Sequence, residues 1–175
     1  MARVILLTGG NLGDVKSRLQ CAQQQINEQI GPVLRCSHRY ESRPWGFDAE
    51  TLFSNQVLEA DTDLSPDELL DAVGRIEVAL GRDRAAEQAE RERTGARYAS
   101  RTIDIDVLFY DDRVIDTPRL CVPHPRIGER EFVLVPLCEV MRERRHPLTG
   151  LTAAEMLEAL RQKNRKPCDD ESRLS

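Results

Sequence analysis

Two aspartates separated by one residue give the sharpest chemical signal in the sequence. Asp104 and Asp106 lie in the apolar segment 101–109, which predicts a strand over residues 102–110. Alternate side chains of a strand share a face, so the two carboxylates point the same way, about 7 Å apart. The opposite, core-facing side chains are then Ile103, Ile105, Val107 and Phe109.

Two carboxylates this close repel each other unless a cation lies between them. Magnesium favours one or two carboxylates together with phosphate oxygens and water. The pair is therefore predicted to hold two metal ions bridged by a polyphosphate. The alternative is a solvated strand face, but aspartate is a poor strand former and two of them in so apolar a strand need a reason.

Arginines are dense in the segment before this strand. Arg82 and Arg84 follow a predicted helix end, and Arg101 directly precedes the aspartates. A guanidinium fork matches the geometry of a phosphate group. Arg91 and Arg93 are better explained by surface salt bridges, whereas the other three are better placed for function.

A histidine between two prolines is a third signal. His124 lies between Pro123 and Pro125, and Arg130 follows closely. Such a histidine is more often structural than functional on its own, but Arg130 makes a second phosphate contact plausible. The sequence has neither a Gly-x4-Gly-Lys-Ser/Thr loop nor dinucleotide glycine spacing. A nucleoside triphosphate would therefore be bound by side chains and metal ions.

These residues are predicted to be positioned by an alternation of strands and helices. Strands are predicted at 3–8, 33–41, 52–60 and 102–110, and helices at 15–30, 65–80, 131–142 and 152–160. Residues 82–100 lack an apolar period and are predicted to form a long exposed loop. The order indicates an α+β fold, a ferredoxin-like antiparallel sheet core with helices on its faces.

Composition limits the classes of partner. Hydrophobic residues make up 40% and charged residues 31%, which is typical of a globular domain, and the net charge is -5. We expect one domain over residues 1–162 with a polar C-terminal tail over 163–175, no nucleic-acid partner and no membrane span. The five cysteines form no Cys-x-x-Cys pair, which favours reduced thiols, two or three of them buried, in a cytoplasmic protein.

In its motifs and their spacing the chain resembles the 6-hydroxymethyl-7,8-dihydropterin pyrophosphokinase family of folate biosynthesis, from Thr8 to about residue 150. The most specific motif is Arg-Thr-Ile-Asp-Ile-Asp at 101–106. The others are Gly-Gly-Asn-Leu-Gly-Asp at 9–14, Tyr-Glu-Ser-x-Pro-x-Gly at 40–46, Phe53 with Asn55, Arg-Ile-Glu at 75–77, Gly-Arg-x-Arg at 81–84, Val-Pro-His at 122–124 and Arg130 with Phe132.

The resemblance implies transfer of pyrophosphate from ATP, the co-substrate, to the hydroxymethyl pterin, with release of AMP. It implies that Asp104 and Asp106 hold two Mg²⁺ ions and that Arg82 and Arg101 are catalytic. The residues implied for ATP are Glu77, Arg84, Tyr98, His124 and Arg130. Those implied for the pterin are Ser42, Pro44, Trp45, Phe53, Asn55 and Phe132.

The sequence departs from the family pattern at a few positions. Gly10 stands where Ser is usual, Gly74 where a polar residue is expected, and Pro125 where Tyr is common; the predicted loop 85–97 is also longer. Two rival functions stay open. Another metal-dependent phosphotransferase would keep the aspartates but lose the pterin slot. A non-catalytic ferredoxin-like module that binds RNA would need exposed aromatics on the sheet and a basic face.

Overall fold

The computed structural model describes residues 1–43, 52–97 and 99–165. An antiparallel sheet in the order β2-β4-β1-β5 forms its centre, and β3 also pairs with β4. The strands are β1 (Ala2–Gly10), β2 (Val33–Cys36), β3 (Tyr40–Ser42), β4 (Phe53–Thr62) and β5 (Asp104–Tyr110). A short hairpin of β6 (Ile115–Asp116) and β7 (Cys121–Val122) follows.

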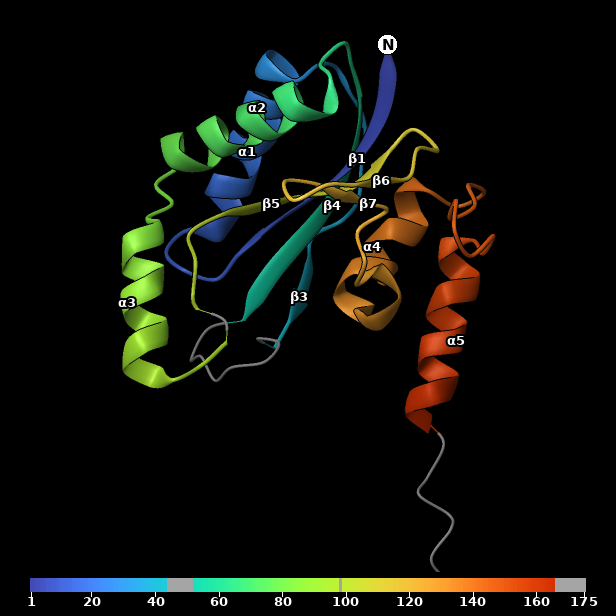
Figure 1. Cartoon of the computed structure of the whole chain (residues 1–175). Coiled ribbons are helices and arrows are strands. Elements are labelled where there is room, and N and C mark those ends of the chain that lie inside the picture. The colour runs from blue at the N-terminus through green and yellow to red at the C-terminus, as the bar shows by residue number, and fades with distance from the viewer. Residues whose placement is uncertain (44–51, 98, 166–175) are drawn as a thin grey trace, which may run out of the picture.

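Helices cover both faces of the sheet (Figure 1), as the predicted α+β class requires. The helices α1 (Val15–Gln29) and α2 (Pro66–Ala79) pack on one face, and α4 (Glu131–Val140) and α5 (Ala153–Arg165) on the other. A short 3-10 helix, η1 (Ile127–Glu129), leads into α4. Among residues 1–43, 52–97 and 99–165, no helix combines the length and apolarity that crossing a membrane would require.

Alternation along the central strand divides the core into two layers. Val4 and Leu6 of β1 pack under α1 and α2, whereas Ile5 and Leu7 pack under α4 and α5. This is the two-residue period of a strand buried on both faces. The helix starts follow their sequence signals: Asp14 accepts a hydrogen bond from the Ser17 amide, and Ser65 and Glu68 form a capping box.

A β-bulge in β5 changes which residues face the core layers. Ile5 pairs with Phe109 and Leu6 with Val107, so the register shifts by one residue between them. Val107 accordingly packs with the α1/α2 layer as predicted, but Phe109 packs with the α4/α5 layer. Phe109 is buried in a core as predicted, but the prediction that it shares a face with Val107 was wrong because a bulge reverses the alternation beyond it. Asp104 and Asp106 lie before the bulge and keep their common face.

The expected loop over 82–100 is in fact mostly a helix. Asp83 caps α3 (Arg84–Thr94) by accepting a hydrogen bond from the Ala86 amide, and Gly95 ends it with a φ of 69°. An apolar period is absent because the helix is exposed: Glu87 is its only buried residue. Alanine, glutamate, glutamine and arginine have high helix propensity, and such a helix can form without an apolar stripe.

Smaller differences from the predicted elements have local causes. The predicted strand 33–41 is divided because the Ser37 hydroxyl accepts the hydrogen bond of the Val57 amide and interrupts the ladder. Pro136 lies inside α4 without ending it, and α5 runs to Arg165, so the expected start of the tail at 163 falls within the helix. The four described cysteines are free thiols, and none is buried, contrary to expectation.

Candidate active site

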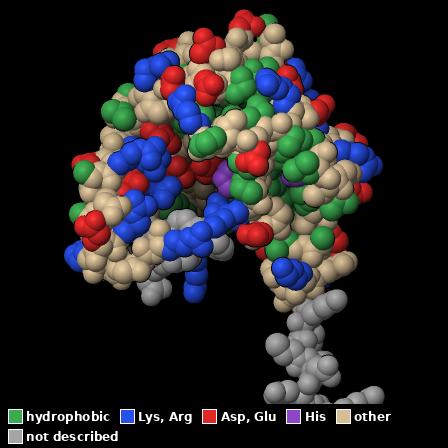
Figure 2. Space-filling model, in the orientation of Figure 1, with side chains coloured by type: hydrophobic (Ala, Val, Ile, Leu, Met, Phe, Trp, Pro, Cys, Tyr) green, Lys and Arg blue, Asp and Glu red, His purple; other side chains and the backbone are tan. Residues whose placement is uncertain are grey.

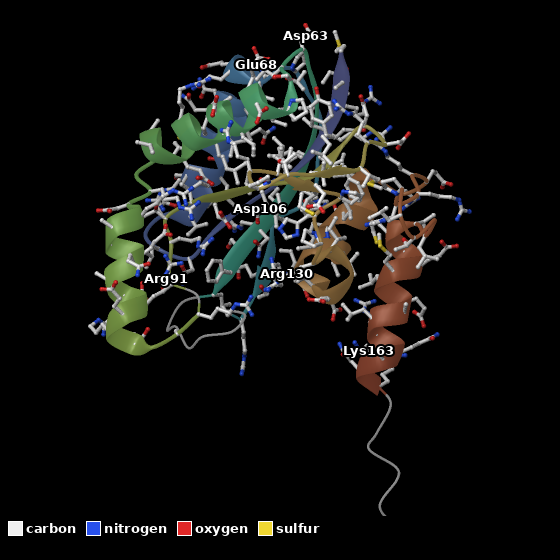
Figure 3. All side chains as sticks on the ribbon, in the orientation of Figure 1. Asp63, Glu68, Arg91, Asp106, Arg130 and Lys163 are labelled. Carbon is white, nitrogen blue, oxygen red and sulfur yellow. The ribbon has the colours of Figure 1, made fainter. Side chains whose placement is uncertain are left out.

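A cleft at one end of the sheet brings most of the predicted site residues together. It has an empty volume of about 560 Å³, part of which is open to solvent. Its lining residues are Leu7, Ser42, Arg43, Phe53, Asn55, Ala99, Arg101, Asp104, Asp106, Arg130 and Phe132. Figure 2 shows this face hollowed, with acidic side chains deep in the hollow and basic ones along its rims. Figure 3 shows Asp106 and Arg130 in the same central part of the molecule, between α3 and α5.

The two aspartates share one face of β5, as predicted, but their surroundings differ. The Asp104 carboxylate accepts from Nη1 of Arg82 at 3.1 Å and from Nη1 of Arg101 at 2.9 Å. Within the described part of the chain, no hydrogen bond or ion pair reaches the Asp106 carboxylate. Burial, and then the negative charge of Asp104, raise the pKa of Asp106 to about 8, although Arg101 and Arg130 oppose the shift.

This carboxylate pair fits a hard divalent cation. Carboxylate oxygens are the donors that Mg²⁺ favours, and Asp106 lacks the compensating positive contact that Asp104 has. Within residues 1–43, 52–97 and 99–165, no cluster of three or more Asp, Glu, His or Cys residues forms a ready-made cage. A metal here would need further oxygens from phosphate or water.

Arg82 lies beneath the cleft and does not line it. Its side chain is 7% exposed and contacts three carboxylates: Glu77 at 2.9 Å, Glu87 at 2.8 Å and Asp104 at 3.1 Å. Burial alone would lower the pKa of Arg82, but these carboxylates together raise it above its usual range. The sequence singled out Arg82 as a phosphate contact, whereas this arrangement connects it to the site through Asp104.

Glu77 is likewise a buried brace and not part of the cleft surface. Its side chain is 4% exposed, accepts a hydrogen bond from the Ile105 amide at 2.9 Å and pairs with Arg84 at 3.2 Å. Burial raises the pKa of Glu77, and the Ile105 amide and Arg82 oppose the shift. Glu77 therefore fixes the strand that carries the aspartates against the end of α2.

Asn11 holds Arg101 in place, a role that sequence reasoning missed. Its Oδ1 accepts from the Arg101 backbone N–H at 2.9 Å, and its Nδ2 donates to Ser100 Oγ at 3.2 Å. The backbone N–H of Asn11 donates to the Arg101 carbonyl at 3.0 Å. The neighbouring Gly10 has no room for a side chain, since a Cβ would lie 2.4 Å from the Thr102 carbonyl oxygen. The missed signal is the asparagine itself, which follows two glycines at a strand end.

The other end of the cleft suits a flat, polar ring. Asn55 Nδ2 and Ser42 Oγ are buried there without a hydrogen-bond partner among the described residues. Phe53 and Phe132 line the same region, and the Arg130 guanidinium lies 5.7 Å from the Phe132 ring centroid. Unpaired buried polar groups are costly, so they point to a ligand that supplies hydrogen bonds. The predicted pterin residues Pro44 and Trp45, and Tyr98, lie outside the described residues.

His124 lies beside the cleft, in a groove between η1 and α5. Its Nδ1 accepts a hydrogen bond from the Arg126 amide at 3.2 Å, and its amide donates to the Leu108 carbonyl. Burial lowers the pKa of His124, and Arg130 lowers it further while Asp104 raises it. The ring is thus neutral near pH 7, with its remaining N–H on Nε2.

The chain is similar to known proteins both in sequence and in fold. A family model described as 7,8-dihydro-6-hydroxymethylpterin-pyrophosphokinase (HPPK) matches residues 5–142. Proteins named 2-amino-4-hydroxy-6-hydroxymethyldihydropteridine pyrophosphokinase are 38% identical in Aquifex aeolicus, covering 85% of this chain and 86% of that one, and 36% identical in Porphyromonas gingivalis, covering 80% and 91%. The folic acid synthesis protein fol1 of Pneumocystis carinii is 34% identical over 94% of this chain, which spans 21% of its length.

Solved structures confirm the fold. Wild-type HPPK-DHPS of Plasmodium falciparum with pteroate superposes with a TM-score of 0.73 at 14% identity, over 94% of this chain and 45% of that one. Another HPPK-DHPS of the same organism, the A437G variant with SDX-DHP, gives a TM-score of 0.71 over 90% of this chain and 45% of that one. The chain thus spans less than half of these solved chains.

Proposed function

Because the chain belongs to the 7,8-dihydro-6-hydroxymethylpterin-pyrophosphokinase family, we propose that it transfers the pyrophosphoryl group of ATP to 6-hydroxymethyl-7,8-dihydropterin in folate biosynthesis. The observation that carries this proposal is the make-up of the cleft. Carboxylates and arginines line it together with the unpaired amide of Asn55. A polyphosphate and a polar ring can therefore meet within one site.

We infer that Asp104 and Asp106 hold the two magnesium ions of this reaction. When bound, the ions would neutralise the phosphate oxygens and draw charge from the β-phosphorus. The Asp106 carboxyl supports this inference, because it lines the cleft and no hydrogen bond or ion pair reaches it within the described residues. Asp104 is already oriented by Arg82 and Arg101.

Arg101 and Arg130 are the arginines proposed to contact the phosphates, since both line the cleft. In the reaction the pterin hydroxymethyl oxygen loses its proton to water and forms a bond to the β-phosphorus, the bond from that phosphorus to the oxygen shared with the α-phosphate breaks, and AMP leaves with that oxygen. Charge spreads over the transferring oxygens, and fixed guanidinium groups stabilise it without reorganisation. Arg84, whose side chain is 70% exposed, and the neutral His124 are proposed to contact the nucleotide.

The pterin ring is proposed to lie between Phe53 and Phe132, with Asn55 on its polar edge. An amide both donates and accepts along one edge, and the Ser42 hydroxyl offers a further contact. From their motif positions Pro44, Trp45 and Tyr98 stay proposed contributors. Arg82 stays a proposed catalytic residue, and Glu77 a proposed nucleotide-side residue, both acting from beneath the cleft.

A different phosphotransferase on the same scaffold would need the aspartates but not the unpaired Asn55 amide, so the cleft favours the pterin. We place the reaction in the cytoplasm, where the free thiols of the described cysteines would persist.

Incubation with ATP, Mg²⁺ and 6-hydroxymethyl-7,8-dihydropterin tests the function. We expect AMP and pyrophosphorylated pterin in equal amounts, and no AMP when the pterin is omitted. ADP as the product would indicate transfer of a single phosphoryl group, and unchanged ATP would contradict the proposal.

A further inference from the structure

The helix α3 is anchored to the molecule by a charge. Figure 1 shows it standing to one side of the sheet, near the segment that leads into β5. Of its residues, Arg84 to Thr94, only Glu87 is buried. Exposed helices of soluble proteins are normally held by an apolar stripe, and α3 instead turns a carboxylate inward.

The Glu87 carboxylate accepts two hydrogen bonds from one edge of the Arg82 guanidinium. Nε of Arg82 donates to Oε1 at 2.8 Å, and Nη2 donates to Oε2 at 3.2 Å. A bidentate pair of this kind fixes the plane of the guanidinium and not merely its position. The remaining nitrogen, Nη1, is thereby turned toward Asp104 at 3.1 Å and Glu77 at 2.9 Å.

We propose that Glu87 is a positioning residue for the metal site: it holds Arg82 so that Nη1 sets the orientation of the Asp104 carboxylate. The chain of contacts runs from α3 through Arg82 to β5, and each contact is a charge-assisted hydrogen bond. The side chains of Glu87 and Arg82 are 6% and 7% exposed, so solvent screens this contact little. The inference rests on the metal site of the proposed function.

Loss of the Glu87–Arg82 pair would change how Arg82 contacts Asp104. Without Glu87, the Nε and Nη2 edge of Arg82 loses its partner, and the guanidinium is free to turn and pair more fully with Asp104. A cation would then have to displace a stronger competitor from an Asp104 carboxylate held in a different orientation. Loss of an outer-shell partner typically weakens metal binding by about 10- to 100-fold.

Direct metal binding tests this without relying on turnover. Mn²⁺, which accepts the same oxygen ligands as Mg²⁺, is titrated into nucleotide-free protein, and the free ion is measured by electron paramagnetic resonance. We expect Glu87→Gln to weaken Mn²⁺ binding about tenfold. Glu90→Gln, on the same helix, is the matched control and should bind Mn²⁺ as the unmodified chain does.

A second variant separates positioning from simple charge loss. Glu87→Asp keeps the charge but shortens the reach, so we expect it to weaken Mn²⁺ binding by at least about threefold. If Glu87→Asp binds normally while Glu87→Gln does not, the effect is through-space and positioning is refuted. Normal binding by both variants also refutes it.

The Arg82→Lys background guards against misfolding and tests the pathway. Lysine retains the charge but lacks the fork, so adding Glu87→Gln in this background should cause no further loss of Mn²⁺ affinity. An additive loss would contradict transmission through Arg82. If the unmodified chain forms AMP but Glu87 variants bind Mn²⁺ normally, only this inference fails; if the unmodified chain binds no Mn²⁺, the proposed metal site fails with it.

Discussion

The two aspartates of the cleft should respond to the same substitution with opposite changes in stability. Asp106→Asn removes a half-buried carboxylate that no hydrogen bond or ion pair contacts among the described residues. Asp104→Asn removes one that Arg82 and Arg101 contact at 3.1 and 2.9 Å. In the absence of metal, we expect Asp106→Asn to raise the free energy of unfolding and Asp104→Asn to lower it.

The gain for Asp106→Asn depends on pH with a defined sign. The pKa of Asp106 is raised to about 8 in the folded chain, against about 4 for an unfolded carboxyl. Between these values the folded state retains a proton that the unfolded state has lost, so the wild-type group destabilises the fold increasingly as pH rises. One pKa unit is worth about 1.4 kcal/mol. We expect Asp106→Asn to gain at least about 2 kcal/mol above the folded pKa and almost nothing near or below about pH 4.

The loss for Asp104→Asn follows from the partners left behind. The side chains of Arg82 and Arg101 are 7% and 16% exposed. Removing one member of a buried ion pair costs about 3–5 kcal/mol. Relief of the repulsion with Asp106 offsets part of this cost. The exposure of the Asp104 side chain, 23%, reduces it further. We expect a net loss of about 1–2 kcal/mol.

Urea unfolding with a chelator present, at about pH 4.5 and pH 8.5, measures both changes. Added Mg²⁺ should then stabilise the unmodified chain more than either variant. AMP formation should fall at least about a hundredfold in both, because loss of a direct ligand should exceed the cost of losing an outer-shell partner. Equal stability changes in the two variants, or a gain for Asp106→Asn that does not depend on pH, would refute the reasoning.

Three further predictions concern the rest of the structure. Asn55→Ala should weaken pterin binding by about 1–3 kcal/mol and leave ATP binding nearly unchanged in calorimetric titrations; Gly9→Ala should resemble it, since a Cβ there would lie 2.4 Å from Asn55 Oδ1, and equal losses for both ligands would instead make Asn55 a folding residue. Burial lowers the pKa of His124 and His146, so the stability they contribute is complete above about pH 6.5 and lost as pH falls below it. Replacing both with Gln should flatten the pH dependence of the free energy of unfolding in urea between about pH 6.5 and 5. An unchanged pH dependence would contradict this. Gly74→Ala should raise the unfolding free energy by about 0.5–1 kcal/mol because alanine favours a helix interior more than glycine, and no atom lies within 4 Å of the added Cβ. A loss of stability would show a hidden clash.

The predictions that succeeded rest on periodicity and capping. The shared face of Asp104 and Asp106 follows from the two-residue period of a strand, and the capping box of Ser65 and Glu68 from local spacing. Phe109 was misplaced because the bulge depends on pairing with β1, a strand that lies far away in the sequence. No local pattern in β5 reveals that partner.

The helix α3 shows a different limit of sequence reasoning. Its residues favour a helix by propensity and by the Asp83 cap, but the search for an apolar stripe discards such a segment. Its anchor, Glu87, contacts Arg82 only through tertiary folding. The tie between Asn11 and Arg101 spans 90 positions, so no spacing rule could have found it.

The arrangement around Asp104 bears on what the site does before substrates arrive. Arg82 and Arg101, two of the three arginines that the sequence singled out as best placed for phosphate contacts, both donate to Asp104. On the proposed function a cation entering at Asp104 competes with both guanidinium groups, whereas at Asp106 it meets no such contact among the described residues. A metal bound at Asp104 would therefore release Arg101, which lines the cleft, to contact phosphate oxygens. Arg82 also pairs with Glu77 and Glu87, so these two carboxylates would keep it in place. On this proposal, metal binding and the release of Arg101 would be a single exchange of partners at the Asp104 carboxylate.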